Sequence, residues 1–445
     1  MMTTQGMTAT AAAVFGALLL MAAKPVTAET IDLPAEFEQE LVVAGLADPS
    51  TLAFSPDGRL FIAERVVGRL RVAVRNESTG VWTLNAEPFY TFDIPKDGGG
   101  QPEAHRSSGI RGFAFDPAFE SNGYVYAFYM KDQPRHNRVV RIQADPGDPD
   151  VALPAETTLF EMPFNGTESS GSHNGGALIV GDDGYLYVST GDGWNGGDNV
   201  QSLTTYTGKI FRIATDGTIP ADNPFYDEAS GDLRAVYALG LRNPYSMSKH
   251  PLSGVIYIND VAGNDKARIL QLQPAANYGH DGYGGIGTDT DDWSNAGTGD
   301  WNGRVISGGA WYPACGVFPP SYFGSYFATL WGTNGFDAGE ISRLDSEADP
   351  ALSSFGTNIA HEDPLGSLKP VYPAIDGDGH LYYLMTNYEA QDGRVYRISP
   401  LSSEQSNCGV ATVPATSLWG AVVMALMLVV VSTWLRRRMT GSAAA

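Results

Sequence analysis

The chain has 445 residues, of which 28 are basic and 50 acidic, so its formal net charge is −22. This negative charge argues against sequence-independent binding to nucleic acid or to an anionic membrane surface, because binding to either requires clustered Lys and Arg. Apolar residues make up 43% of the chain, and the 52 Gly and 27 Pro residues indicate many tight turns between short strands rather than a disordered or helical protein.

Residues 1–28 are typical of a secretory signal peptide. The apolar run over residues 11–21 is too short to span a bilayer, and Val26 and Ala28 follow it with the spacing of a small-residue cleavage site. No Lys or Arg precedes the apolar run, which makes the amino-terminal part of the signal weak. The expectation is that the rest of the chain is exported.

Six copies of one short pattern follow, each a turn glycine and then alternating apolar residues. The glycines are Gly58, Gly123, Gly184, Gly254, Gly324 and Gly379. A turn glycine between runs of period 2 indicates a β-hairpin, and repeats of about 60 residues with several strands are typical of propeller blades. We predict that residues 29–413 form one all-β domain, a six-bladed β-propeller, and that residues 37–43 supply the strand that closes the ring.

Polar residues gather in the loops that the predicted fold places at one end of the channel. His173 lies beside glycines, so it is a candidate general base, or else a histidine that hydrogen-bonds between blades. Arg242 has a planar guanidinium group and Asn243 has an amide, and both can donate hydrogen bonds to a carboxylate or quinone oxygen. The alternative for Arg242 is a salt bridge from blade to blade.

Three further features leave alternatives open. Residues 260–265 supply carboxylate and carbonyl oxygens for calcium, or form an Asx-rich turn. Residues 281–302, rich in Asp, Gly, Asn and Trp, form either a sugar-facing loop or a flexible acidic one. Cys315 and Cys408 are the only cysteines, and in an oxidising compartment they form one disulfide if the fold brings them together.

Residues 414–445 are predicted to be a membrane anchor or sorting tail. Residues 418–435 are mostly apolar and Arg436–Arg438 follow at once, which suits a transmembrane helix with its C-terminal end in the cytoplasm. With Pro414, Trp419 and Gly420 just before the helix, the tail resembles the IPTL-CTERM class of bacterial sorting signals. The expected location is therefore the bacterial periplasm or cell surface, with membrane contact only through this helix.

Eight tracts of the propeller domain form an ordered set. They are Leu52–Leu60, Gly109–Phe119, His173–Gly176, Ser189–Asp192, Gly208–Ile210, Ile219–Pro224, Gly240–Pro244 and Asn277–Gly279. In this order they resemble the soluble PQQ-dependent glucose/sorbosone dehydrogenases, which include the aldose sugar dehydrogenases. The resemblance extends over nearly all of residues 38–400.

The resemblance implies a sugar dehydrogenase that oxidises the anomeric carbon of an aldose to a lactone, with PQQ and Ca²⁺ as cofactors and an external electron acceptor. His173 matches the histidine that takes the proton of the anomeric hydroxyl. Arg242 and Asn243 match residues at the reacting end of PQQ. The main-chain carbonyls of Ala262 and Gly263 match those that hold calcium.

The same resemblance shows where this chain departs from the family. Ser172 occupies the position of an acidic neighbour of the histidine, so we expect His173 to lack an orienting carboxylate. Lys369 matches a residue that pairs with PQQ carboxylates, but Val371 stands where a second cation is expected, and residues 333–337 contain none.

Two other classes of function stay open on the sequence. The first is a non-catalytic surface propeller that binds a glycan or protein partner, which the missing cofactor cations favour. The second is a calcium-dependent lactonase, for which Asp192, Asn243 and Asp260 are the candidate ligands.

Overall fold

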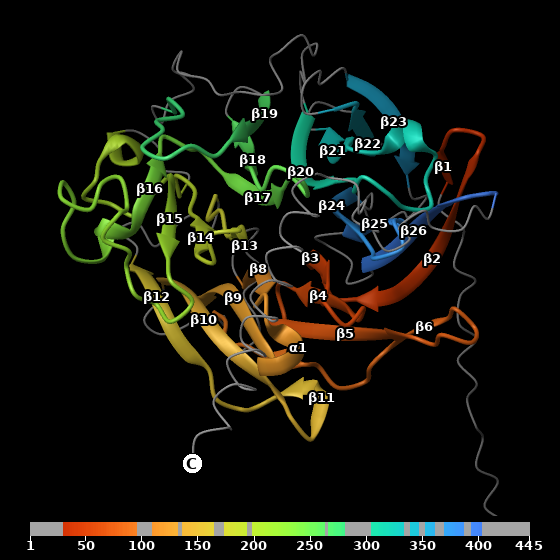
Figure 1. The fold of residues 1–445 in the computed structure, drawn as a ribbon, viewed down its shortest axis with the longest axis horizontal. Helices are drawn as coiled ribbons and strands as arrows, with labels where there is room; N and C mark the ends of the chain where they lie inside the picture. Colours follow the sequence, from red (N-terminus) through yellow and green to blue (C-terminus); the bar gives the residue numbers. More distant parts are fainter. Residues whose placement is uncertain are drawn as a thin grey trace, which may run out of the picture.

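The computed structural model shows six antiparallel sheets that follow one another around a central axis (Figure 1). The residues it describes are 30–95, 109–131, 136–163, 173–193, 198–262, 266–280, 304–332, 339–346, 352–360, 369–386 and 393–402. The predicted six-bladed propeller is confirmed, and each sheet is one blade. The predicted signal peptide, the acidic loop 281–302 and the C-terminal tail lie outside the described residues. Among the helices that are described, none is long and apolar enough to cross a membrane.

Blades 1 to 4 each begin with the strand nearest the axis and continue outward along the chain. Blade 1 contains β3 (Pro49–Phe54), β4 (Leu60–Glu64), β5 (Arg69–Arg75), β6 (Trp82–Leu84) and β7 (Tyr90–Thr91). Blade 2 contains β8 (Ile110–Phe115), β9 (Tyr124–Lys131), β10 (His136–Asp145), β11 (Asp148–Ala152) and β12 (Thr157–Pro163). Blade 3 contains β13 (Leu178–Val180), β14 (Leu186–Ser189), β15 (Lys209–Ile213) and β16 (Val236–Leu239), and blade 4 contains β17 (Pro244–Lys249), β18 (Ile256–Ala262) and β19 (Lys266–Gln271).

Blades 5 and 6 each take their outermost strand from the N-terminal part of the chain. Blade 5 contains β20 (Arg304–Trp311), β21 (Tyr326–Gly332), β22 (Gly339–Leu344), β23 (Leu352–Ala360) and β1 (Thr30–Asp32). Blade 6 contains β24 (Lys369–Ile375), β25 (Leu381–Thr386), β26 (Gly393–Pro400) and β2 (Phe37–Leu46). The antiparallel pairing of β2 with β26 is the predicted ring closure, and it is confirmed.

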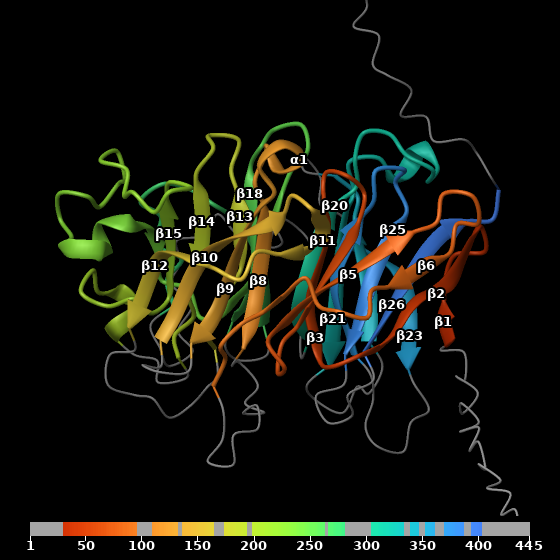
Figure 2. The same cartoon turned by 90° about the horizontal axis from the view of Figure 1, so that it is seen from below.

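The described helices are short and lie between the strands. They are α1 (Phe119–Asn122) and the 3₁₀ turns η1 (Asp198–Gln201), η2 (Gly231–Ala235) and η4 (Pro320–Tyr322). Because α1 follows the end of β8, it marks the end of the propeller at which the innermost strands finish, at the top of Figure 2.

The six repeat glycines all occupy the same structural position, just before the second strand of a blade. Each has a positive φ, between 65° and 90°, which a residue with a Cβ adopts only at a cost. The repeated glycine therefore marks the turn that starts each hairpin. This is why the blade number could be predicted from the sequence.

The core consists of six apolar layers, each between two neighbouring blades. Successive side chains of a strand point to opposite faces of its sheet. In β4, Phe61 and Ala63 pack towards blade 2, whereas Leu60 and Ile62 pack towards blade 6. Both faces of each middle strand are therefore buried, and the ring is held together by contacts between blades.

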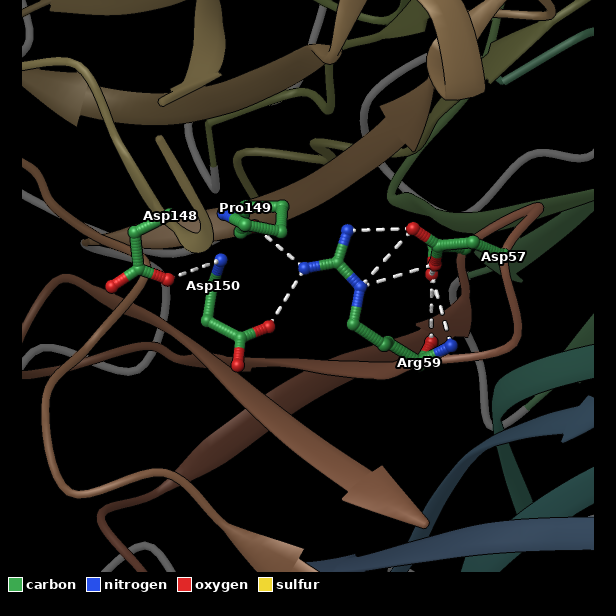
Figure 3. Close-up of polar contacts among 6 residues, drawn as sticks. Asp57, Arg59, Asp148, Pro149 and Asp150 are labelled. Atoms are coloured by element: carbon green, nitrogen blue, oxygen red, sulfur yellow. Dashed lines mark hydrogen bonds and ion pairs between the residues drawn. The ribbon is translucent and has the colours of Figure 1, made fainter. Parts of the chain in front are cut away.

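Arg59 joins blades 1 and 2 at the end opposite the candidate site. Its guanidinium forms ion pairs with Asp57 at 2.7 Å and with Asp150 at 2.8 Å, and it donates to the carbonyl of Pro149 at 2.5 Å (Figure 3). Asp57 lies in the same turn, while Pro149 and Asp150 belong to β11 of the next blade. One side chain thus joins the inner hairpin of blade 1 to the outer strand β11 of blade 2.

Cys315 is disulfide-bonded, in agreement with the disulfide considered from the sequence. Cys408, the only other cysteine of the sequence, lies outside the described residues.

Candidate functional site

The candidate residues lie at one end of the propeller, the end at which the innermost strands begin. His173 precedes β13, Arg242 and Asn243 directly precede β17, and Lys369 is the first residue of β24. We call this end the site face. The fold therefore brings the described candidates from blades 3, 4 and 6 to the same face, as predicted.

His173 is held by a buried carboxylate of its own blade. Its Nδ1 lies 2.7 Å from Oδ1 of Asp192, which follows the end of β14. An ionised carboxylate only accepts hydrogen bonds, so Nδ1 carries the proton and the lone pair of neutral His173 is on Nε2. The side chains of His173 and Asp192 are 11% and 5% exposed. This arrangement orients the imidazole as a proton acceptor.

The expectation that His173 lacks an orienting carboxylate is therefore wrong. That expectation rested on Ser172, the neighbour in sequence, whereas the carboxylate comes from Asp192, 19 residues later. In the sequence, Asp192 stands out only as part of the Ser189–Asp192 tract and as a candidate calcium ligand, not as a partner of His173. An acidic residue soon after a buried strand of the same blade was the signal that could have identified it.

A second histidine contacts the same carboxylate. His280 Nε2 lies 3.0 Å from Oδ2 of Asp192, and the His280 side chain is only 4% exposed. His280 comes from the segment after β19, in blade 4. His280 could not be identified from the sequence, because nothing local distinguishes it from other residues of a loop.

Hydrogen bonds from Asp192 and from Gly175 connect the segment of the histidine to Arg242 and Asn243. The Asp192 amide donates to the Arg242 carbonyl at 2.7 Å, and Oδ1 of Asn243 accepts from the Gly175 amide at 3.2 Å. The Arg242 guanidinium donates to the carbonyl of Val261 at 2.8 Å, within its own blade. The three predicted residues thus belong to one hydrogen-bonded network.

Asp260 is engaged in a different role from the predicted one. It is fully buried, forms an ion pair with Arg268 at 2.5 Å and accepts from the Asn243 amide at 2.8 Å. A carboxylate paired with a buried guanidinium is a poor additional calcium ligand, so the predicted calcium role for Asp260 is not supported. The alternative of an Asx-rich turn is also wrong for Asp260, because it lies within β18.

The calcium-dependent lactonase loses its candidate ligands for the same reason. Asp192 is held between two histidines, Asn243 Oδ1 accepts from a backbone amide, and Asp260 faces Arg268. Each of these three side chains already accepts from a donor of the protein, which does not favour them as a shared set of cation ligands.

The remaining predicted positions are only partly described. Ala262 is the last residue of β18, where its main chain pairs with Lys266. Gly263, the other predicted calcium-binding carbonyl, lies outside the described residues. Lys369 is partly buried at the start of β24.

A buried lysine supports the segment behind Asp192. The Nζ of Lys209 donates to the carbonyls of Thr207 at 2.6 Å and Val200 at 2.8 Å, and the residue has no exposed surface. Its main chain pairs with Thr190, two residues before Asp192. Burial lowers the pKa of Lys209 from its usual 10.5 to about 7, because the charged amine loses its hydration.

Comparison with known proteins agrees with this arrangement. The sequence profile of the family described as Glucose / Sorbosone dehydrogenase matches residues 46–289. Quinoprotein glucose dehydrogenase B of Acinetobacter calcoaceticus is 27% identical over an alignment of 288 residues, and the match covers 57% of this chain and 54% of that protein. Human (Homo sapiens) Hedgehog-interacting protein is 28% identical over an alignment of 268 residues, and the match covers 53% of this chain and 36% of that protein.

The chain spans about half the length of the first curated relatives that it matches. Among solved structures, the PQQ-bound aldose sugar dehydrogenase of Streptomyces coelicolor has a TM-score of 0.59 at 23% identity. That match covers 83% of this chain and 99% of the other, and at this identity it supports the fold. With more than half of the chain inside the family profile, the protein belongs to the Glucose / Sorbosone dehydrogenase family.

Proposed function

We propose that this protein is an exported aldose dehydrogenase that uses PQQ and Ca²⁺ to oxidise the anomeric carbon of a sugar to a lactone. The observation that carries the proposal is the hydrogen bond between His173 Nδ1 and Asp192. A base that must take a hydroxyl proton needs its lone pair in a fixed direction, and the carboxylate provides this by fixing the tautomer.

The residues of the site face fit the reacting end of an anionic quinone. A guanidinium, a buried amide and an oriented imidazole are the donors and acceptors that such a group needs, and Arg242, Asn243 and His173 supply them in one network. Lys369 supplies a cation at the same face. Main-chain carbonyl oxygens such as that of Ala262 are the hard ligands that calcium prefers.

In the proposed reaction, His173 accepts the proton of the anomeric hydroxyl at Nε2. Asp192 then stabilises the imidazolium that forms, and Arg242 stabilises negative charge that develops on the acceptor side. Bound PQQ would supply the acceptor for the hydride from C1, with Ca²⁺ polarising it. An external acceptor would then take up the two electrons.

One alternative retains support, a propeller that binds a protein or glycan partner without catalysis. The similarity to Hedgehog-interacting protein favours it, because that relative is named for a protein partner. The ion pair between Asp260 and Arg268 also favours it. Because Arg268 is already neutralised by Asp260, it does not replace the missing cations for the carboxylates of PQQ.

Reconstitution separates the two proposals. The full chain is incubated with PQQ and calcium, freed of unbound cofactor by gel filtration, and assayed with a panel of aldoses and an artificial electron acceptor. We expect sugar-dependent reduction of the acceptor that is lost when EDTA replaces calcium during loading. Retention of PQQ without any aldose oxidation, or no retention at all, would favour the binding propeller.

A further inference from the structure

Asp192 bridges two imidazoles from different blades. Its Oδ1 lies 2.7 Å from Nδ1 of His173, and its Oδ2 lies 3.0 Å from Nε2 of His280. Because the ionised carboxylate only accepts, each of these two ring nitrogens must carry a proton. One carboxylate thus fixes both tautomers, with Nδ1–H on His173 and Nε2–H on His280.

The segment that carries His280 is itself firmly placed. The His280 amide donates to the carbonyl of Gly240 at 2.9 Å, and its own carbonyl accepts from Gln201 Nε2 at 2.7 Å. Two residues earlier, the Tyr278 amide donates to the carbonyl of Leu239, the last residue of β16, at 2.9 Å. The segment that follows blade 4 therefore packs against blade 3, and these backbone hydrogen bonds place the imidazole of His280 next to Asp192.

Burial makes the second contact important for the first. Asp192 and His280 are 7% and 4% exposed, so water contributes little to the solvation of the carboxylate. The donor from His280 helps to fix the direction of Oδ2, and rotation of the carboxylate would change the direction of Oδ1. The orientation of His173 depends on both oxygens of Asp192.

From these contacts we propose that His280 is a positioning residue, which holds the Asp192 carboxylate and so fixes the Nδ1–H tautomer of His173. Only the predicted effect of His280 on catalysis rests on the proposed function. The positioning itself is a property of the polypeptide and can be measured without cofactor or substrate.

The test uses the full chain labelled with ¹⁵N at its seven histidines, with ring nitrogen shifts read by long-range proton–nitrogen correlation spectra. The signals of His173 and His280 are assigned by their disappearance in His173→Gln and His280→Gln. In the unaltered protein we expect Nδ1–H on His173 and Nε2–H on His280. An Nε2–H tautomer for His173 would overturn the proposal without any need for a variant.

Two substitutions at His280 separate the hydrogen bond from packing. Gln places an amide N–H near the position of the histidine Nε2, so His280→Gln should preserve the His173 tautomer, whereas His280→Phe removes the donor and should produce a mixture. His380→Phe is the matched control, because His380 also pairs with a carboxylate, Asp376 at 3.0 Å, in the turn between β24 and β25. Unchanged His173 shifts in His280→Phe, or equal changes in the Gln and Phe variants, would overturn the proposal.

Activity provides the second measurement. If the protein oxidises aldoses, His280→Phe should lower kcat about 10- to 100-fold with little change in KM, and His280→Gln should recover most of that loss. If no aldose is oxidised by the unaltered protein while the NMR result is as expected, the proposed function fails and the positioning role stands. Full activity in His280→Phe would contradict the positioning role alone.

Discussion

The carbonyl oxygen of His173 lies only 2.0 Å from the position that a Cβ on residue 191 would occupy. Gly191 is therefore required by space, since its backbone runs directly against that of the histidine. His173 itself has a positive φ of 52°, a strained conformation for a residue with a side chain. Gly191, which directly precedes Asp192, packs against His173 and helps to hold its backbone at this positive φ.

Gly191→Ala should disturb the site directly. The added methyl group must push the His173 backbone away, and we expect a loss of about 1–3 kcal/mol in the free energy of unfolding, together with loss of aldose oxidation. Gly184→Ala is the control in the same blade, because Gly184 has a φ of +80° but no atom within 4 Å of its added Cβ. It should cost about 1 kcal/mol and leave the rate unchanged. Equal effects of the two variants on activity would contradict this account of Gly191.

Asp192→Asn tests the orienting role of the carboxylate. An amide can donate to His173 as well as accept from it, so the Nδ1–H tautomer is no longer enforced, and we expect kcat for aldose oxidation to fall about 10²- to 10⁴-fold. Asp183→Asn is the matched control, since Asp183 pairs with Arg212 at 3.1 Å in the same blade, beside the turn glycine at the opposite end. Steady-state kinetics on both variants decide the point, and a normal rate in Asp192→Asn would exclude the orienting role.

Lys209 should make stability depend on pH in a defined direction. Its folded pKa of about 7 lies below the usual 10.5, so between these values the unfolded chain holds a proton that the folded chain has released. The free energy of unfolding therefore rises with pH above about 7, by at most about 1.4 kcal/mol per pH unit from this group. Below pH 7 the amine is charged in both states and its contribution is constant.

The measurement is the difference in unfolding free energy between the unaltered protein and Lys209→Met. Groups elsewhere titrate alike in both proteins and cancel. This difference in unfolding free energy should not vary with pH below pH 7. From pH 7 to 10 the unaltered protein should become more stable relative to Lys209→Met. A difference that does not vary with pH would mean that Lys209 keeps its ordinary pKa.

Closure of the ring by β2 can be tested with two leucines of that strand. Leu46 is fully buried against blades 1 and 6, whereas Leu41 is 38% exposed. We expect Leu46→Ala to lower the free energy of unfolding by about 2–5 kcal/mol and Leu41→Ala to change it by about 0.5 kcal/mol or less. Similar unfolding midpoints for the two variants would show that β2 is not part of the cooperative unit.

The fold could be predicted because its signals are local. Each blade repeats one turn glycine followed by a buried strand, and the number of blades follows from counting these turns. The clamp formed by Arg59 and Asp150 could not be predicted, because the two residues are 91 positions apart and meet only once two blades are in register.

The site was accessible to the sequence only in part. His173, Arg242 and Asn243 stand out beside glycine or proline in recognisable tracts. The partner of His173 could not be chosen from the sequence, since Ser172 is adjacent while Asp192 is 19 residues away, and His280 is a further 88 residues along. Asp260 shows the converse, because a carboxylate has the same appearance in a sequence whether it meets calcium or Arg268.

The most direct test of the proposed function compares the unaltered protein with His173→Ala after loading both with PQQ and calcium. Absorbance of the bound cofactor and reduction of an artificial acceptor are followed in the same sample. We predict that both proteins retain PQQ and that only the unaltered protein turns over an aldose. Undiminished turnover in His173→Ala would contradict the role of His173 as the base, and no retention of PQQ by either protein would contradict the cofactor.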